Sequence, residues 1–247
     1  MKVKSILVTQ PKPETEKSPY FDIAKKYSVK IDFRPFIHVE GIPAKDFRAN
    51  RININDYSAV VLTSKHAADH FFRMCTEMRI EDVEKFKFFC ISESTAYYLQ
   101  KYVQFRKRKI FFGKQTIYDL MDVLKKHKKE KFLVPCSDVA KQEIFDALSK
   151  NDIAYQQMTI YRTVCSDLSD LANVNYDLLV FFSPSGITSL FKNFPKFKQN
   201  ETRIAAFGNT TSQAVSDAGL RLDIKAPIPE APSMTMAIEQ YLKKNNK

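Results

Sequence analysis

The stretches "YSAVVLTSKHAADHFF" (residues 57–72) and "YDLLVFFSPSGITSLF" (residues 176–191) align residue for residue, with Tyr57 opposite Tyr176 and Ser64 opposite Ser183. In each stretch a short apolar run typical of a buried strand passes into a serine-containing turn and then into a helical pattern. A strand that delivers a turn to the start of a helix is the unit from which mainly parallel α/β sheets are built. The pair therefore predicts a repeated α/β unit.

A second pair of stretches repeats in the same way. The segment "FFCISESTAYYL" (residues 88–99) aligns with the part of "RIAAFGNTTSQAVSDAGL" (residues 203–220) that places Ser92 opposite Gly208 and Thr95 opposite Thr211. "ILVT" near the start also resembles "FLVP" at residues 132–135. Repetition of several elements in one order indicates two diverged copies of a single structural unit.

Short apolar runs and helical patterns alternate along the whole chain, as expected of an α/β protein with mainly parallel sheets flanked by helices. The expected strands are 3–9, 30–39, 59–63, 87–91, 109–112, 131–135, 155–164, 178–182, 203–207 and 222–225. Helices are expected near 18–27, 67–78, 94–103, 116–127, 138–149, 187–194, 210–218 and 233–243. Thr116 and Ser233 are the expected N-caps of two of these helices.

Length, charge and cysteine content limit the class of protein. The 247 residues, 44% of them hydrophobic, suffice for one large or two ordinary domains. No apolar run approaches the roughly 18 residues of a membrane span and no signal peptide is evident, so a cytoplasmic protein without a membrane partner is expected. The scattered cysteines, without a CxxC pair, suggest neither a zinc site nor disulfides. These residues are Cys75, Cys90, Cys136 and Cys165.

The formal charge of +11 favours an anionic partner without naming it. The densest basic runs are "RKRK" (residues 106–109) and "KKHKKEK" (residues 125–131). Neither run has the interleaved aromatic and glycine residues of an RNA-binding sheet, and the second continues an amphipathic helix. A nucleic-acid partner is therefore not expected, whereas a polycarboxylate remains open.

The serine and threonine turns are candidate anion sites. Two similar halves usually form two lobes with a cleft, and ligands of open α/β sheets bind beyond the carboxyl ends of the strands. Helix N-termini at those ends present N–H groups that suit an anion. The alternative is that Ser183, Ser185, Thr210 and Thr211 only cap helices.

These turns resemble those of the uroporphyrinogen-III synthase family. The similar segments occur in family order along the whole chain, and "FFSPSG" and "GNTT" are the most specific. The segments are "ILVTQPKP" (6–13), "VVLTSKHA" (60–67), "ISESTAYYL" (91–99), "LVPCSDVAKQEIFDAL" (133–148), "TIYRTV" (159–164), "VFFSPSGITSLF" (180–191), "AFGNTTSQAVSDAGL" (206–220) and "PSMTMAIEQYL" (232–242).

The resemblance implies a particular architecture. It consists of two α/β lobes with a cleft between them, joined by two extended crossings that correspond here to "DFRPFIHV" (32–39) and "MTIYRTVC" (158–165). The first lobe is expected to comprise residues 1–36 and 165–247, and the second residues 37–164. A monomer is expected.

The resemblance also implies a reaction. Members of the family close linear hydroxymethylbilane into uroporphyrinogen III, with loss of water and inversion of ring D, as a lyase without a metal or organic cofactor. Tyr161 matches the tyrosine proposed in the family as the proton donor. Residues that match turns holding substrate carboxylates are Ser64, Thr95, Ser183, Ser185, Gly186, Thr210 and Thr211. Lys141 and Arg162 are weaker candidates.

The sequence departs from the family pattern at the turns. Lys65 and His66 replace a Pro and Asn-like pair, Ser92 and Glu93 replace a glycine-led turn, and Asn209 occupies a common proline position. Ser92 would hinder close backbone approach if its turn required a positive φ angle.

Three alternatives therefore stay open. The first is a non-catalytic two-lobed homologue that binds an anionic ligand. The second is nucleic-acid binding through the basic runs, which their composition does not favour. The third concerns Tyr161 alone: it is also compatible with the pattern of a strand residue that has no role in a reaction. His66 and His70 have the spacing of a metal-binding pair, but no third ligand is apparent, so no metal site is expected.

Overall fold

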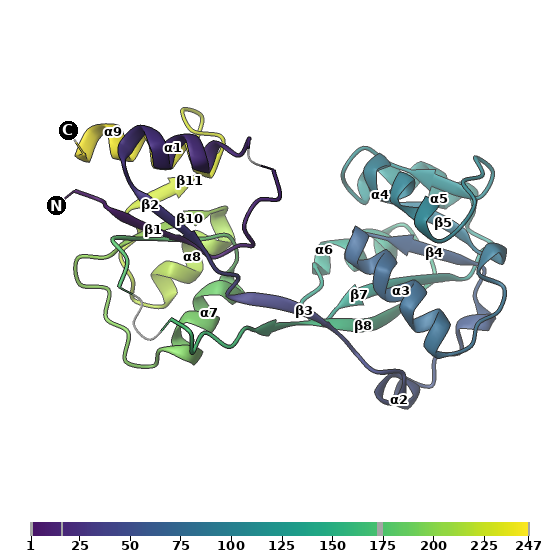
Figure 1. The fold of residues 1–247 in the computed structure, drawn as a ribbon. Coiled ribbons are helices and arrows are strands. Elements are labelled where there is room, and N and C mark those ends of the chain that lie inside the picture. Colours follow the sequence, from purple (N-terminus) through teal and green to yellow (C-terminus); the bar gives the residue numbers. More distant parts are fainter. Residues whose placement is uncertain (1, 16, 172–174, 247) are drawn as a thin grey trace. The chain divides into compact units, whose positions relative to one another are not determined.

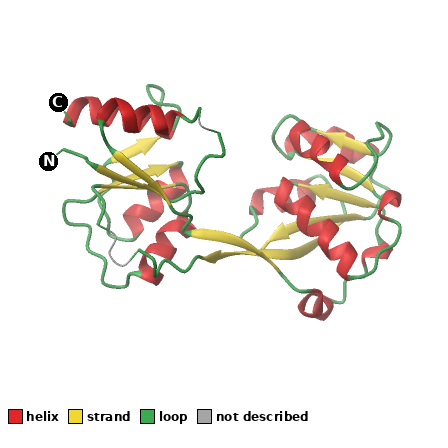
Figure 2. Cartoon of the chain, in the orientation of Figure 1, coloured by secondary structure: helices red, strands yellow, loops and turns green. Residues whose placement is uncertain are grey.

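The structure is a computed structural model that describes residues 2–15, 17–171 and 175–246. The chain divides into two compact units, as Figure 1 shows. Unit 1 comprises Met1–His38 and Val164–Lys247, and unit 2 comprises Val39–Thr163. Unit 2 is thus inserted between the two segments that form unit 1. The class is α/β with mainly parallel sheets flanked by helices, as predicted (Figure 2).

Unit 1 is built on a five-stranded sheet whose described pairings are parallel. In spatial order the strands are β11 (Ile224–Ala226), β10 (Arg203–Phe207), β9 (Leu178–Phe181), β1 (Ser5–Val8) and β2 (Lys30–Phe33). Helices α1 (Pro19–Tyr27) and α9 (Met234–Asn245) lie side by side on one face, and the other face carries α7 (Pro184–Asn193) and α8 (Asn209–Asp217) (Figure 1).

The strands of unit 1 are buried on both faces. Ile6 and Val8 pack with the α1 and α9 side chains, whereas Leu7 between them packs with those of α7. Alternate residues of a strand point to opposite faces, so a strand between two helical layers must be apolar at every position. The continuous apolar runs in the sequence follow from this arrangement.

Unit 2 contains a six-stranded sheet. In spatial order the strands are β3 (Ile37–Gly41), β8 (Tyr155–Cys165), β7 (Phe132–Ser137), β4 (Ala59–Leu62), β5 (Lys87–Cys90) and β6 (Ile110–Phe112). One face packs against α2 (Ala44–Phe47), α3 (Lys65–Glu77) and α4 (Glu93–Tyr98), and the other against α5 (Met121–Lys126) and α6 (Gln142–Lys150). Single 3₁₀ turns occur at Arg48–Asn50, Ile54–Asp56, Val83–Lys85, Leu99–Lys101 and Tyr118–Leu120.

Two neighbouring strands connect the units. The chain leaves unit 1 along β3 and returns along β8, so both strands cross the boundary between the units (Figure 1). The expected single strand at 30–39 is instead two strands, β2 and β3. Pro35 lies between them, and because proline has no N–H group it cannot continue a hydrogen-bonded ladder. The first crossing therefore starts at Ile37, later than predicted.

Serine side chains cap several helices. Ser233 caps α9 by accepting a hydrogen bond from the Met236 N–H at 3.2 Å, as predicted. The predicted cap at Thr116 is wrong. Its N–H and hydroxyl both donate to the Asp119 carboxylate at 2.8 Å, and α5 begins only at Met121. The Gln115 and Thr116 N–H groups hold the pKa of Asp119 below its usual value.

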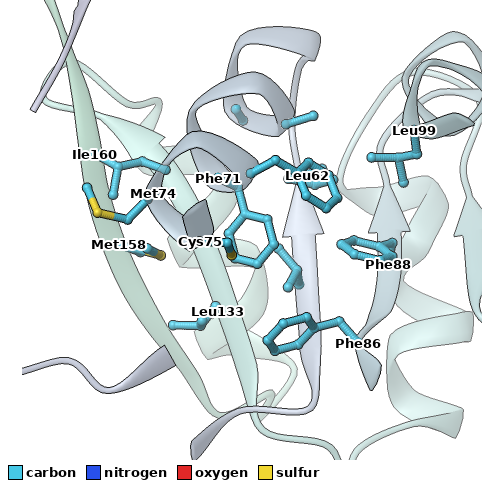
Figure 3. Close-up of a cluster of buried hydrophobic side chains, with 14 of the residues drawn as sticks. Leu62, Phe71, Met74, Cys75, Phe86, Phe88, Leu99, Leu133, Met158 and Ile160 are labelled. Carbon is cyan, nitrogen blue, oxygen red and sulfur yellow. The ribbon is translucent and has the colours of Figure 1, made fainter. Parts of the chain in front are cut away.

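The core of unit 2 beneath α3 and α4 is rich in aromatic side chains, as Figure 3 shows. Phe71 of α3 is fully buried and meets Phe86 and Phe88 edge to face, with ring centroids 5.6 Å and 6.3 Å away. Met158 and Ile160 of β8 enter the same cluster. Among the residues that the structure describes, no helix has both the length and the apolar character needed to cross a membrane.

Phe71→Ala is expected to destabilise unit 2 strongly. Removing a buried aromatic ring costs about 3–5 kcal/mol in free energy of unfolding, because both burial and packing are lost. Urea unfolding followed by circular dichroism measures the change. The control is Tyr118→Ala, whose side chain is 57% exposed and whose loss should cost at most about 0.5 kcal/mol. Equal effects of the two variants would contradict this account of the core.

Candidate functional site

Two of the predicted turns lie side by side in unit 1. Strands β9 and β10 are parallel neighbours, and each ends in a turn that starts a helix. The first turn contains Ser183 and the second contains Gly208. Since parallel neighbouring strands end at the same edge of the sheet, the N-termini of α7 and α8 both lie at that edge.

The Ser183 turn is held by capping hydrogen bonds. The Ser183 hydroxyl accepts from the Gly186 N–H at 3.3 Å, and Ser185 between them is only partly exposed. A Cβ atom at Gly186 would come within 3.2 Å of the Phe181 ring. A side chain at Gly186 would therefore press on the buried Phe181 ring, and the Gly186 N–H is already bonded within the turn.

The Gly208 turn has a different backbone. Gly208 has φ of 88°, which side-chain-bearing residues rarely adopt, and its N–H donates to the Ala226 carbonyl at 2.6 Å. Asn209 and Thr210 are exposed in the first turn of α8, whereas Thr211 is 1% exposed. Of the two predicted threonines, only Thr210 thus presents its side chain to solvent.

Unit 2 contains the corresponding pair of turns, after the parallel neighbours β4 and β5. The Ser64 hydroxyl accepts from the Ala67 N–H at 3.0 Å, and the Ser92 hydroxyl accepts from the Thr95 N–H at 3.3 Å. Ser92 also lies 3.0 Å from the Thr95 hydroxyl, which is buried inside the turn. Ser92 has φ of −141°, so this turn does not require the positive φ that glycine would supply.

Tyr161 lies at an irregularity in β8. Cys136 of β7 pairs with Thr159 but the next residue, Ser137, pairs with Tyr161, so Ile160 has no partner in β7. Such a bulge redirects the side chains that follow it. As a result Ile160 and Tyr161, although adjacent in sequence, both join the core beneath α3.

A pocket of about 220 Å³ opens beside Tyr161, within unit 2. Thr63 after β4, Ile91 after β5 and Ser137 at the end of β7 line it, together with Lys141 and side chains of α6. The pocket therefore lies at the carboxyl edge of the sheet, where ligands of open α/β sheets bind.

Tyr161 is 8% exposed, and its ring stacks on the ring of His70 from α3, with centroids 4.9 Å apart and planes 16° apart. Burial raises the pKa of the Tyr161 phenol, and a hydrogen bond with the Ser64 hydroxyl partly opposes this rise. Because the Ser64 oxygen accepts the Ala67 N–H, its own proton can go to the phenol oxygen. The phenol keeps its proton and can donate it elsewhere.

The weaker candidates fall into different surroundings. Lys141 is exposed at the N-terminus of α6 and lines the Tyr161 pocket. Arg162 points elsewhere and pairs with Glu40 at 3.3 Å. Cys136 lines the pocket, and burial raises the pKa of its thiol. His70 stacks on Tyr161 and accepts a hydrogen bond from Arg73.

A larger cavity, of about 700 Å³, lies in unit 1 between Tyr176 and the segment from Phe194 to Arg203. It is at the amino ends of β9 and β10, the opposite edge from the turns, and none of the predicted site residues lines it. We therefore place the candidate site at the carboxyl edges.

Sequence reasoning missed the neighbours of Tyr161. The sequence pattern at His70 suggests only a metal-binding pair with His66, and no motif includes Arg73. The contacts of His70 and Arg73 join α3 to β8, which are far apart in the chain: Arg73 and Ile160 are separated by 87 residues. A local sequence pattern does not predict a contact between residues so far apart in the chain.

Comparisons with known proteins give one consistent result. The family model described as uroporphyrinogen-III synthase HemD matches residues 20–236. A uroporphyrinogen-III synthase from Chlorobaculum parvum is 22% identical over 98% of this chain and 100% of its own length. A putative uroporphyrinogen-III synthase from Methanocaldococcus jannaschii is 24% identical over 87% of this chain and 90% of its own.

Solved structures share the fold. The uroporphyrinogen-III synthetase of Helicobacter pylori covers 98% of this chain and 99% of its own, with a TM-score of 0.62 and 16% identity. A mutant uroporphyrinogen III synthase from Thermus thermophilus has the same coverage, a TM-score of 0.55 and 15% identity. With the family match over most of its length, the chain belongs to the uroporphyrinogen-III synthase family of tetrapyrrole biosynthesis.

Proposed function

We propose that this protein is a lyase that closes hydroxymethylbilane into uroporphyrinogen III, with loss of water and inversion of ring D. The observation that carries the proposal is the Tyr161 phenol beside a pocket at the carboxyl edge of unit 2. Family membership supplies the substrate class, a small tetrapyrrole.

The reaction requires a proton for the departing hydroxyl group of the substrate. A buried phenol with a raised pKa is a weak acid, but it stays protonated at neutral pH and can donate a positioned hydrogen bond. In the proposed mechanism Ser64 donates to the phenol oxygen, which directs the phenol proton toward the substrate. The step changes no oxidation state, so it needs no redox cofactor.

The substrate carries eight carboxylates, and their charge suits both the net charge of +11 and the helix N-termini at the turns. We propose that the turns holding Ser183, Ser185, Gly186, Thr210 and Thr211 in unit 1, and those holding Ser64 and Thr95 in unit 2, form the carboxylate-binding surface. Ser183 would contribute its hydroxyl proton, whereas Gly186 would support its turn and Ser64 would hold the Tyr161 phenol. Ser185 and Thr210 would bind through their side chains, whereas buried Thr211 and Thr95 would shape the turns. A cleft between the lobes, a monomeric state and a cytoplasmic location remain predictions from the sequence.

Tyr161→Phe is expected to lower the rate of uroporphyrinogen III formation about 100-fold or more, because general acid catalysis contributes at least that factor. The assay supplies freshly generated hydroxymethylbilane and separates isomers I and III by chromatography, since unassisted closure yields isomer I. Tyr155→Phe is the matched control, because Tyr155 lies on the same strand and, among the described residues, its hydroxyl hydrogen-bonds only with Ser149, at 3.4 Å.

Formation of isomer I alone by the unaltered protein would favour the non-catalytic binding homologue. Formation of isomer III at an unchanged rate by Tyr161→Phe would preserve the activity but remove Tyr161 as the proton donor.

Ser183→Ala is expected to raise KM about tenfold, the loss of one hydrogen bond to a charged group. Ser233→Ala removes an equivalent cap, since both hydroxyls accept one N–H three residues ahead, at 3.3 Å and 3.2 Å. Both variants should lose about 0.5–2 kcal/mol of stability, but only Ser183→Ala should change KM. Steady-state kinetics with thermal unfolding compares them, and equal KM values would identify Ser183 as a cap and nothing more.

A further inference from the structure

Arg73 of α3 joins the helix to both strands that connect the units. Its Nη2 group donates to the carbonyl oxygens of Ile42 and Ile160, each at 3.0 Å. The Ile160 carbonyl also accepts the Ile42 N–H at 2.9 Å, the hydrogen bond that continues the pairing of β3 with β8. Ile160 is the unpaired residue of the bulge, so the guanidinium binds the backbone directly before Tyr161.

The surroundings of Arg73 hold the guanidinium in this position. Glu77, one turn further along α3, accepts from Nη1 with one carboxylate oxygen and from the Ala44 N–H with the other. A Cβ atom at Gly41 would lie 2.7 Å from the Arg73 Cζ atom, so glycine leaves the space that the guanidinium fills. Lysine could not replace this planar group, which donates four hydrogen bonds to four different acceptors.

Arg73 also fixes the state of His70. The Arg73 Nε group donates to the His70 Nδ1 atom at 3.3 Å, so the proton of the neutral imidazole is on Nε2. Burial lowers the pKa of His70, electrostatic interactions with Arg73 and His66 lower it further, and the carboxylate of Asp69 opposes them. His70 is then an uncharged, flat surface against which the Tyr161 ring stacks.

We propose that Arg73 and His70 are positioning residues for Tyr161: Arg73 secures the β8 bulge at Ile160, and His70 holds the phenol ring against α3. Neither residue is assigned a contact with the substrate. The proposal rests on the proposed function of Tyr161 as proton donor. A displacement of about 1 Å at a reacting group can lower a rate by about 100-fold, so secure placement of the phenol matters for turnover.

Kinetics of four variants test the proposal. His70→Ala and Arg73→Met should each lower kcat for isomer III about tenfold or more while KM changes by less than about twofold, because substrate contacts are preserved. His70→Phe, which restores a flat ring, should recover most of the kcat lost in His70→Ala. Arg73→Lys should fail to restore kcat, because an ammonium group cannot make the same set of hydrogen bonds.

Matched controls exist elsewhere in the chain. His127→Ala removes another histidine packed on an aromatic ring, that of Phe111 at 4.6 Å, and Arg221→Met removes another guanidinium bonded to backbone carbonyls. Both controls should keep kcat within about twofold of the unaltered protein. Equal losses in a control and in its test variant would overturn the proposal, because general destabilisation would explain both.

A second readout separates this proposal from the proposed function. In protein labelled with ¹³C at the tyrosine Cζ, the Tyr161 signal is identified by its absence in Tyr161→Phe, and its titration gives the phenol pKa. Removal of the His70 ring should admit water and bring that raised pKa toward its ordinary value. If the unaltered protein forms isomer III but the Tyr161 pKa is unchanged in His70→Ala, only the positioning proposal is overturned. If the unaltered protein forms only isomer I, the proposed function is overturned, and with it any catalytic role of His70 and Arg73.

Discussion

The placement of every candidate residue depends on the rule that parallel neighbours in a sheet end at the same edge. In unit 1 this rule brings the Ser183 and Gly208 turns together, and in unit 2 it brings the Ser64 and Ser92 turns together. The strands between helical layers are buried on both faces, so their apolar residues leave no room for polar chemistry except at the ends. The candidate residues therefore lie in the turns or, like Tyr161, level with the carboxyl end of a neighbouring strand.

Side chains along a strand alternate between the two faces of the sheet, but Tyr161 breaks this alternation in β8. The bulge at Ile160 is the physical cause. Without the extra residue, Ile160 and Tyr161 would point to opposite faces of the sheet. With it, the phenol reaches α3 on one side and the pocket at the carboxyl edge on the other. A local defect in the ladder thus gives one side chain access to two surroundings, and hydrogen bonds from outside the sheet hold the defect in place.

The sequence predicted the parts of this structure that depend on local or repeated patterns. The strand and turn at Ser64 were found from their likeness to those at Ser183, and Ser233 was recognised as a cap by its own neighbours. The errors have equally local causes: Thr116 is hydrogen-bonded to Asp119 instead of capping a helix, and Pro35 divides an apparent strand. The role of His70 was not predictable, because its ring meets Tyr161 only once α3 packs across the sheet.

The insertion of unit 2 into unit 1 also affects the order in which the protein can fold during synthesis. All strands of unit 2 lie between residues 37 and 165, so its sheet can be complete while the ribosome has yet to make the second segment of unit 1. Strands β1 and β2 meanwhile lack their neighbour β9, which begins only at Leu178, and the face of β1 that carries Leu7 stays uncovered until α7 emerges. Nascent chains generally fold domain by domain as residues emerge, but here the first strands made belong to the last domain completed. Until β9 is made, the unpaired edge of β1 is a site at which the nascent chain can aggregate.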